Sequence, residues 1–381
     1  MTQEASPILH LTYSRRGGAG NIASLLVESQ NELGYDARLV TVADYSISSK
    51  PLSDPVQALA AAIDQLVLAK RGSELFTIIR NRISRITDRI EADGAILHLH
   101  WLPAAASDAL ASELSKRALK TIWTLHDYRP ITGGCHYPAQ CNGFNSGCHD
   151  CPQVRGFARG LITRSFERKV ESLSGSSITF VSPSTGLFQA AKHSLAAAGH
   201  KVELIPNPVA SSTNTLSEPR FVSNSKQYIF VAANVEEKRK GLSSVLDWWA
   251  VVRQPSETLL LVGQGSEKFQ STTQGIFAAG STQPVELANA YRNSRALVFA
   301  SSEDNAPGVL AEAASHGLPI ICLDPQMRAW LSDDGLTTLE LDQVRRLSKA
   351  DAESLVGSYE QFLQARQPQV AAQRYFNLYF S

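Results

Sequence analysis

A surplus of charge of either sign is absent from this chain, which has 36 lysines and arginines against 36 aspartates and glutamates. Proteins that bind nucleic acid usually carry a strongly basic surface, so this class is disfavoured. Apolar runs of the ~20 residues that span a membrane are also missing. The first residues lack the charged-then-apolar pattern of a signal peptide, so we expect a cytoplasmic protein, in which disulfides are rare.

The length of 381 residues is too great for one ordinary core, and two domains are expected. Short apolar runs alternate with helical patterns, which is typical of parallel sheets covered by helices on both faces. The expected strands are 8–13, 37–42, 95–100, 121–125, 178–181, 202–205, 228–232, 259–262, 275–279, 296–300 and 319–323. The expected helices include 21–33, 107–119, 186–198, 242–252, 285–293 and 309–316.

One stretch, residues 210–227, is polar and rich in serine and asparagine, and we interpret it as a linker. It separates an N-terminal Rossmann-like domain, 1–210, from a C-terminal one, 211–364. The last segment, 365–381, is expected to be a helix that packs back on the N-terminal domain. Ligands of doubly wound sheets bind beyond the carboxyl ends of the strands, so the residues there are the candidates for a site.

A glycine-rich turn, SRRGGAGN, follows the first expected strand. Gly17, Gly18 and Gly20 precede a helix, where backbone N–H groups can approach an anion. The turn matches neither G-x-G-x-x-G nor a P-loop. A tight connection from strand to helix explains the glycines equally well.

Histidines follow two other strands of the first half. His98 and His100, in HLHW, share one face of a strand end, and they fit the polar lining of a cleft better than a metal pair. His126 and Asp127, in WTLHDYRP, come directly after an apolar strand. A His-Asp pair at the carboxyl end of a strand is a candidate for a functional site.

The second half places a basic turn and a helix start at strand ends. Arg239 and Lys240, in EEKRKG, lie near the N-terminus of a helix, whose dipole favours anions. A solvated run of charges is the alternative. Backbone N–H groups at 308–310 open a later helix and could receive a phosphate, with Asp304 before that helix and Glu312 inside it.

The segment DNAPGVLAEAASHGLP is similar to the E-x7-E signature of the family 4 retaining glycosyltransferases. RKG after a strand, VGQG and IPNPV follow the family's order, and the resemblance covers nearly the whole chain. It implies the GT-B fold, in which two Rossmann-like, doubly wound parallel-sheet domains face a central cleft. WTLHDYRPITGGCHYPAQCNGFNSGCHDCPQ resembles the branch that builds colanic acid and other bacterial exopolysaccharides.

The resemblance also implies roles for single residues. The implied catalytic residues are His126, Asp304 and Lys240. The implied donor-binding residues are Arg239, Lys240, Gly308, Val309, Glu312, Gly17 and Gly18. Lys240 and Arg239 would contact the diphosphate of the donor, and Glu312 would bind its ribose. Asp304 and His126 would lie by the transferred sugar.

Three positions depart from the family pattern. Asp304 replaces the usual first glutamate and is one methylene shorter. Val235 stands where the family has an arginine about five residues before the phosphate-binding lysine, so Arg239 would substitute for it from another place. Pro325 and Gln326 replace the glycine pair that usually follows the last strand.

The expected reaction moves a sugar from UDP or GDP to a hydroxyl of a growing bacterial surface glycan or capsule, with retention of configuration. We expect catalysis to need no cofactor, because no D-x-D motif at a strand end would hold a metal. A glycosidase using Asp304 and Glu312 as paired carboxylates would not need a diphosphate site. A sugar-nucleotide epimerase shares the GT-B fold and stays open, as does a non-catalytic subunit that binds a sugar nucleotide or serves as a zinc scaffold.

Four of the five cysteines share one loop with the spacing C-x5-C-x6-C-x2-C, and only the last pair has the usual zinc-knuckle spacing. These residues are Cys135, Cys141, Cys148 and Cys151. Four thiolates can form a closed structural zinc site, which would order a polar loop that buries little. Disulfides or free thiols would also be compatible with this spacing.

Two basic amphipathic stretches could lie on an anionic membrane surface. The first carries the stripe Ile79, Ile83, Ile86 and Ile90 among arginines. The second, 154–170, carries Phe157, Leu161, Ile162 and Phe166 among five basic residues. Membrane contact fits an acceptor on a lipid diphosphate at the inner face of the plasma membrane. The alternative is that both stripes pack on the N-terminal sheet.

Overall fold

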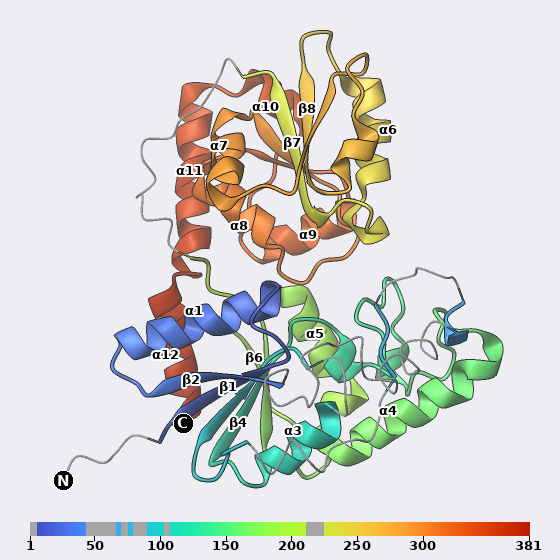
Figure 1. The fold of residues 1–381 in the computed structure, drawn as a ribbon, viewed down its shortest axis with the longest axis vertical. Coiled ribbons are helices and arrows are strands. Elements are labelled where there is room, and N and C mark those ends of the chain that lie inside the picture. The colour runs from blue at the N-terminus through green and yellow to red at the C-terminus, as the bar shows by residue number, and fades with distance from the viewer. Residues whose placement is uncertain (1–5, 43–65, 70–74, 79–89, 103–106, 211–224) are drawn as a thin grey trace. The chain divides into compact units, whose positions relative to one another are not determined.

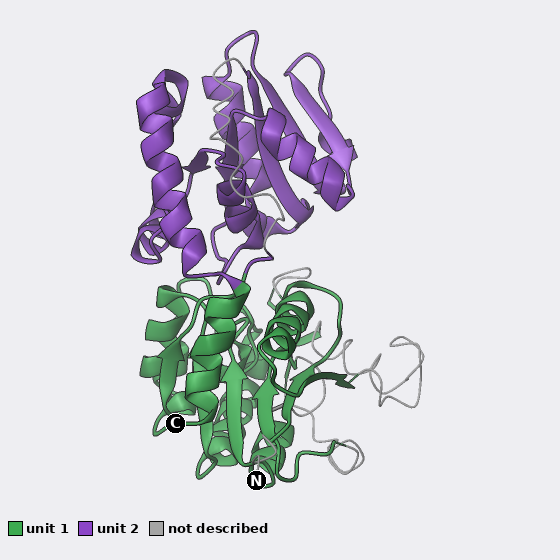
Figure 2. Ribbon diagram, turned by 90° about the vertical axis from the view of Figure 1, so that its left-hand side faces the viewer, with its two compact units in different colours: residues 1–208, 368–381 green, residues 209–367 purple. Residues whose placement is uncertain are grey.

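The computed structural model of the protein describes residues 6–42, 66–69, 75–78, 90–102, 107–210 and 225–381. The chain forms two compact units, residues 1–208 with 368–381, and residues 209–367 (Figure 2). Each unit has one parallel sheet between helices, so the predicted doubly wound α/β class is confirmed. In the part of the chain described here, no helix combines the length and the apolar character that crossing a bilayer requires.

The sheet of the first unit has six parallel strands in the order β2-β1-β3-β4-β5-β6 (Figure 1). They are β1 (Ile8–Thr12), β2 (Ala37–Thr41), β3 (Ile96–Leu99), β4 (Lys120–Thr124), β5 (Ile178–Ser182) and β6 (Val202–Leu204). The inner strands are buried on both faces, which is why they read as continuous apolar runs. From β1 the chain leads to β2 on one side and later to β3 on the other, so the sheet has its switch point between β1 and β3.

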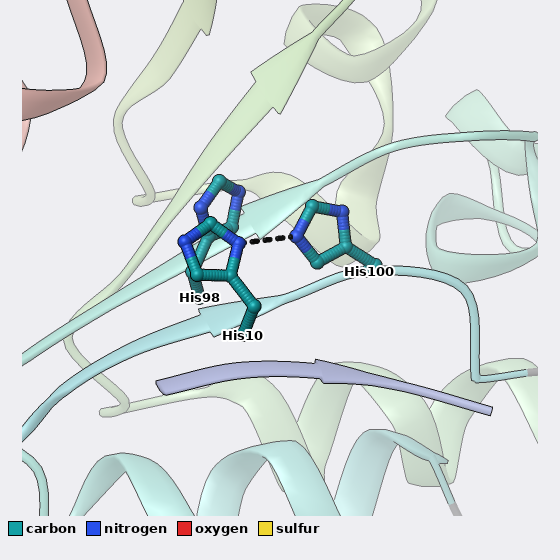
Figure 3. Close-up of side chains that lie close together, drawn as sticks. All are labelled: His10, His98 and His100. Carbon is teal, nitrogen blue, oxygen red and sulfur yellow. Dashed lines mark hydrogen bonds between the residues drawn. The ribbon is translucent and has the colours of Figure 1, made fainter. Parts of the chain in front are cut away.

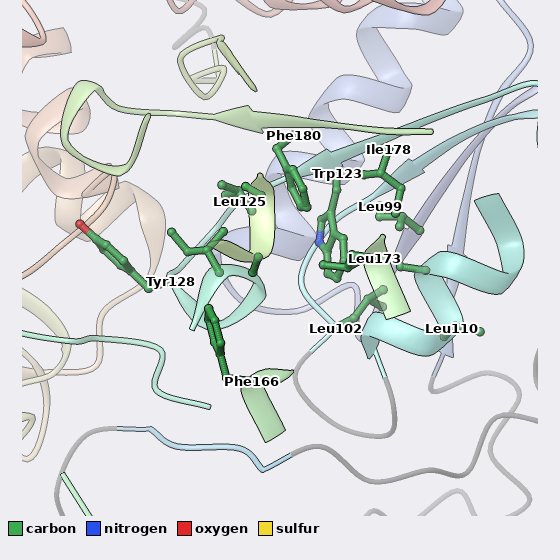
Figure 4. Close-up of a cluster of buried hydrophobic side chains, with 14 of the residues drawn as sticks. Leu99, Leu102, Leu110, Trp123, Leu125, Tyr128, Phe166, Leu173, Ile178 and Phe180 are labelled. Atoms are coloured by element: carbon green, nitrogen blue, oxygen red, sulfur yellow. The ribbon is translucent and has the colours of Figure 1, made fainter. Parts of the chain in front are cut away.

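Helices cover both faces of this sheet. They are α1 (Gly18–Glu32), α3 (Ser107–Ser115), α4 (Arg159–Leu173), α5 (Thr185–His193) and α12 (Pro368–Tyr379). Successive strand residues point to opposite faces. Ile8 therefore packs with α1 and α12, whereas Leu9 and Trp123 belong to the larger core under α3, α4 and α5. Figure 4 shows that core, with the rings of Trp123 and Phe180 5.8 Å apart between their centroids.

The second unit has a five-stranded parallel sheet in the order β11-β10-β7-β8-β9. Its strands are β7 (Gln227–Asn234), β8 (Thr258–Gln264), β9 (Ile276–Gly280), β10 (Ala296–Phe299) and β11 (Ile320–Cys322). The switch point lies between β7 and β10. The helices are α6 (Leu242–Val252), α7 (Pro284–Asn293), α8 (Gly308–Ser315), α9 (Pro325–Asp333), α10 (Leu341–Arg346) and α11 (Lys349–Gln364). Buried side chains of α6 and α10 cover one face, and those of α7, α8, α9 and α11 the other.

Apolar periodicity in the sequence did not predict helices α9, α10 and α11. Their clearest signals are caps. Asp324 accepts a hydrogen bond from the N–H of Met327 at 2.8 Å, and Pro325 opens α9. Ser348 and Asp351 form a capping box at the start of α11. Caps mark where a helix begins even where its apolar stripe is narrow.

Candidate functional site

A basic turn occupies the switch point of the second sheet. The 3₁₀ turn Lys238–Lys240 follows β7, and Gly241 then opens α6 with φ +76°. A Cβ atom at Gly241 would lie 2.1 Å from the carbonyl oxygen of Ala300, at the end of β10. Glycine therefore lets the turn approach the neighbouring strand closely. Two hydrogen bonds to the carbonyl of Arg239, from Ser301 Oγ at 3.0 Å and from the N–H of Ser302 at 2.9 Å, join the two loops.

Asp304 gathers the two cations of this turn. Its Oδ2 lies 2.5 Å from Lys240 Nζ and 3.5 Å from Arg239 Nη1. Arg239 also contacts Glu237 at 2.8 Å. The Lys240 side chain is 20% exposed and the Asp304 side chain 13%, so an anionic ligand can reach the cations at a partly desolvated site. Such a ligand competes with Asp304 for the ammonium group of Lys240.

The N-terminus of α8 adds main-chain donors to the same loop. Pro307 occupies the N-cap position and no side chain caps the first turn. The dipole and the first amides of a helix favour an anion at this end. Glu312 lies one turn further on, where its Oε2 accepts a hydrogen bond from the Tyr291 hydroxyl at 3.0 Å. Burial raises the pKa of Glu312, and the hydrogen bond from Tyr291 opposes this shift.

The structure thus brings together five of the residues predicted in the second half. Arg239 and Lys240 lie at the end of β7, and Asp304 lies in the loop after β10 that leads to Gly308 and Glu312 in α8. A Cβ atom at Gly308 would lie 3.9 Å from Glu312 Oε1, so the first residue of α8 faces that carboxylate. Val309 follows in the same uncapped turn. The arrangement can bind an anion and hydroxyl groups next to one another.

The glycines after β1 have two different roles. Gly17 is the N-cap of α1 with φ +88°, and a Cβ atom at Gly17 or Gly18 would meet nothing within 4 Å. A Cβ atom at Gly20 would lie 2.4 Å from the carbonyl oxygen of Ser14. The tight turn therefore explains Gly20, whereas Gly17 and Gly18 leave an open backbone surface at the start of a helix without a side-chain cap.

The histidines at the switch point of the first sheet are buried. His10 of β1 lies beside His98 and His100 (Figure 3). All three side chains are 0% exposed, so the expectation that His98 and His100 line an open cleft is wrong. The three side chains offer ligand atoms within 4.8 Å of one another. All six of their ring nitrogens already make hydrogen bonds within the protein. The cluster is therefore better interpreted as a polar network than as a metal centre.

His10 was missed by sequence reasoning, because a single histidine within an apolar strand carries no motif. Its pairing with His98 follows from the parallel register of β1 and β3. Burial lowers the pKa of His10 to about 4 and the pKa values of His98 and His100 well below their ordinary value. The three imidazoles are therefore neutral at physiological pH.

His126 extends this network to the end of β4. Its Nε2 lies 3.0 Å from His100 Nδ1, and burial lowers its pKa to about 4, although the charge of Asp127 opposes the shift. Asp127 accepts hydrogen bonds from Trp101 at 2.6 Å and from His136 at 2.7 Å. Burial alone would raise the pKa of Asp127, but the charge and hydrogen bond of His136 bring it below its ordinary value. Asp127 therefore fixes the loop that carries His126.

The cysteine loop is anchored by more than its thiols. Cys135, Cys148 and Cys151 are buried and Cys141 is half-buried, and all are free. All four line one cavity of about 20 Å³. Phe144 is 4% exposed, and the buried ammonium of Lys169 donates to the carbonyl of Thr132 at 2.6 Å. Within the described ranges, only the three histidines place three ligand atoms within 4.8 Å, so the four sulfurs are spread more widely.

The amphipathic stretch 154–170 does not present one continuous apolar face. Ile162 and Phe166 of α4 are 1% exposed and belong to the larger core of the first unit, as expected if the stripe packs on the sheet. Phe157 is 72% exposed and Leu161 42% exposed. Of the isoleucine stripe, Ile90 is buried and the other three residues lie outside the described residues.

Residues 225–363 match the family model described as Glycosyl transferases group 1. The colanic acid biosynthesis glycosyl transferase WcaC of Escherichia coli strain K12 is 25% identical over 291 residues, which are 71% of this chain and 69% of that protein. Among solved structures, sucrose-phosphate synthase from Thermosynechococcus elongatus gives a TM-score of 0.60 at 14% identity, over 99% of this chain and 98% of the other. The pneumococcal O-GlcNAc transferase GtfA, in complex with UDP and GlcNAc, gives 0.59 at 11% identity, over 98% of each chain.

The chain has two doubly wound units, each with polar residues at its switch point. This architecture and the structural neighbours define the GT-B fold. The resemblance found in the sequence is confirmed. The chain has the GT-B fold and is similar to the family 4 glycosyltransferases, and its residues 225–363 match the group 1 glycosyl transferase model.

The close approach at Gly241 predicts a stability effect. Gly241→Ala forces a left-handed φ on alanine, which costs about 1–2 kcal/mol, and also drives Cβ into the carbonyl of Ala300. Gly335 is the matched control, because it has φ +82° but nothing within 4 Å of its Cβ position. We expect Gly241→Ala to lower the free energy of unfolding by at least about 1 kcal/mol more than Gly335→Ala, measured by urea denaturation. Equal losses would contradict the close approach.

Proposed function

We propose that the protein transfers a sugar from a nucleotide-diphosphate sugar, with UDP or GDP as the nucleotide, to a hydroxyl of a growing bacterial surface polysaccharide or exopolysaccharide, with retention of the anomeric configuration. The observation that carries this proposal is the grouping of Lys240, Arg239 and Asp304 beside the uncapped start of α8. The match to group 1 glycosyl transferases and the 25% identity to a colanic acid glycosyl transferase support the polysaccharide acceptor.

In the proposed reaction, the bond between the anomeric carbon and the diphosphate oxygen breaks and negative charge grows on the leaving group. Lys240, Arg239 and the first amides of α8 supply positive charge and donors at that point, so the proposal includes no divalent metal. The acceptor oxygen forms the new bond on the same face of the sugar. Its proton passes to the departing phosphate oxygen.

The two carboxylates have separate roles in this proposal. Asp304 holds Lys240 in place before the donor binds and then lies by the transferred sugar. Glu312, oriented by Tyr291, accepts hydrogen bonds from the ribose hydroxyls. In the first unit, Gly17 and Gly18 give the donor or acceptor access to main-chain N–H groups, and His126 contacts the sugar.

One experiment separates transfer from epimerisation and from binding alone. The protein is incubated with UDP- and GDP-sugars, with and without a polysaccharide acceptor fraction, and the nucleotide and sugar products are analysed. Release of UDP or GDP that depends on acceptor supports transfer. An isomerised donor supports the epimerase, and binding without turnover supports a non-catalytic subunit.

Lys240 gives the sharpest test of the diphosphate site. Lys240→Ala is expected to reduce turnover by roughly 10²–10³, the scale for the loss of one electrostatic stabiliser of a transition state. Lys238 is the matched control, because it is an exposed lysine of the same turn. Lys238→Ala should keep near-normal turnover, and Glu312→Gln should mainly raise the KM for the donor. Normal turnover in Lys240→Ala would remove the phosphate assignment.

We also propose that the cysteine loop binds a structural zinc ion. The four thiols line one cavity of about 20 Å³, enough for a single small occupant. Gly143 donates its N–H to Cys141 Sγ at 3.4 Å. Burial raises the pKa values of Cys148 and Cys151, and main-chain N–H groups of residues 133, 153 and 154 oppose this shift. Such donors are typical around metal-bound thiolates. The thiols must come closer together than in this structure to share one ion.

The zinc proposal predicts about one zinc per chain in protein purified without chelator or metal-affinity resin. Cys148→Ser should lose the metal and lower the melting temperature. Cys322→Ser is the control, because Cys322 is buried in β11 of the other unit and should leave the zinc content unchanged. Metal-free native protein with full activity would refute the proposal.

A third proposal concerns the membrane. Phe157 and Leu161 are exposed on the segment that leads into α4 and on its first turns. The exposed arginines around them are Arg155, Arg159, Arg164 and Arg168. Apolar side chains among cations can insert at the surface of an anionic bilayer. We propose that this patch gives the enzyme peripheral contact with the membrane that carries a lipid-diphosphate-linked acceptor.

Flotation with phosphatidylglycerol vesicles tests this patch. The native protein should float with the vesicles at low salt and be released by high salt, because exposed charges are screened. The double variant Phe157→Glu with Leu161→Glu should remain in the bottom fraction. Val251→Glu changes an apolar residue that is 85% exposed on the other unit, and it should float like the native protein. A native protein that never floats would refute the contact.

A further inference from the structure

A chain of hydrogen bonds runs from α1 through the first sheet to His126. Gln30 Oε1 lies 2.8 Å from His10 Nε2. His10 Nδ1 lies 3.0 Å from His100 Nε2, and His100 Nδ1 lies 3.0 Å from His126 Nε2 (Figure 3 shows the link between His10 and His100). Each ring is bonded to the next, so the nitrogen that carries the hydrogen in one imidazole decides which nitrogen carries it in the neighbouring ring.

The first acceptor in the chain fixes its direction. A carbonyl oxygen can only accept, so His10 must carry its hydrogen on Nε2. A neutral imidazole has one N–H, which leaves His10 Nδ1 as an acceptor, and His100 must then donate from Nε2. By the same step His126 donates from Nε2 to His100. His126 therefore has no hydrogen on Nδ1, and this atom can only accept a hydrogen bond.

A second branch starts from the same amide. Gln30 Nε2 donates to the Tyr379 hydroxyl at 3.1 Å, and that hydroxyl lies 2.6 Å from His98 Nδ1. His98 Nε2 lies 2.7 Å from Thr124 Oγ1, and Thr124 in turn lies 2.7 Å from the Tyr375 hydroxyl. The amide of Gln30 thus supplies one acceptor to the first branch and one donor to the second. A reversed amide would reverse the first branch.

We propose that Gln30 acts as a positioning residue, which through His10 and His100 holds His126 in the neutral form that has its hydrogen on Nε2 and an acceptor at Nδ1. This inference rests on the proposed function, in which His126 contacts the transferred sugar. An acceptor at Nδ1 suits donor groups such as the hydroxyls of that sugar. Because His126 is uncharged, it adds no positive charge near the anomeric carbon, which itself becomes positive as the diphosphate leaves.

The first test needs no activity measurement. The protein is labelled with ¹⁵N-histidine, and long-range ¹H–¹⁵N correlation spectra distinguish protonated from unprotonated ring nitrogens. The signal of His126 among the nine histidines is assigned with a His126→Asn variant. We expect His126 to be protonated on Nε2 alone at pH 7. A hydrogen on Nδ1, or a doubly protonated ring, would overturn the proposal whatever the enzyme's substrate is.

Two variants of Gln30 then test its role. Gln30→Glu places a carboxylate beside His10 and favours a charged His10 that donates from both nitrogens, so His100 and then His126 should shift their hydrogen to Nδ1. Gln30→Met removes the acceptor for His10 at similar size, so His126 should populate both tautomers and kcat should fall roughly tenfold, the rate equivalent of one hydrogen bond. Unchanged tautomers in Gln30→Met would overturn the positioning role. A changed tautomer with normal transfer would instead separate this network from the proposed contact with the sugar.

Discussion

Each sheet reverses its strand order at one place, and the rest of this structure depends on that constraint. Neighbouring strands lead to opposite sides there, so no connection crosses the carboxyl edge between them. In the first unit the reversal lies between β1 and β3, and in the second between β7 and β10. His10 and His98 meet at the first, whereas Lys240 and Asp304 meet beyond the second. The topology therefore assembles both sites from residues far apart in sequence.

The two edges differ in what covers them. At the first, helix α12 packs on the sheet face that carries the histidines, so they are fully buried, and desolvation keeps them neutral. At the second edge Lys240 and Asp304 keep 20% and 13% of their side chains exposed, and the charges are retained as an ion pair. Burial thus converts one set of polar groups into a fixed network of dipoles. Partial exposure leaves the other set accessible to solvent.

The strands could be predicted because a buried parallel strand is a continuous apolar run, as at Ile178–Ser182. Lys240, Asp304 and Glu312 could be proposed because they follow such runs and resemble a family signature. The partners that these residues contact could not be predicted. Lys240 meets Asp304 across 64 positions, and His10 meets His100 across 90. Local pattern carries no information about such contacts, and Lys169 under the cysteine loop was missed for the same reason.

Helix α12, at the end of the described chain, forms hydrogen bonds with residues of the first unit that lie far earlier in the sequence. Tyr379 receives a hydrogen bond from Gln30 and satisfies His98, and Tyr375 contacts Thr124. Without these hydroxyls, polar groups in the core would lose partners, at a cost of about 1–3 kcal/mol each. The hydrogen-bond network of the first unit therefore includes side chains from residues 368–381, which follow the second unit, residues 209–367, in the sequence. The same helix that closes the core also contributes to the burial that keeps His98 uncharged.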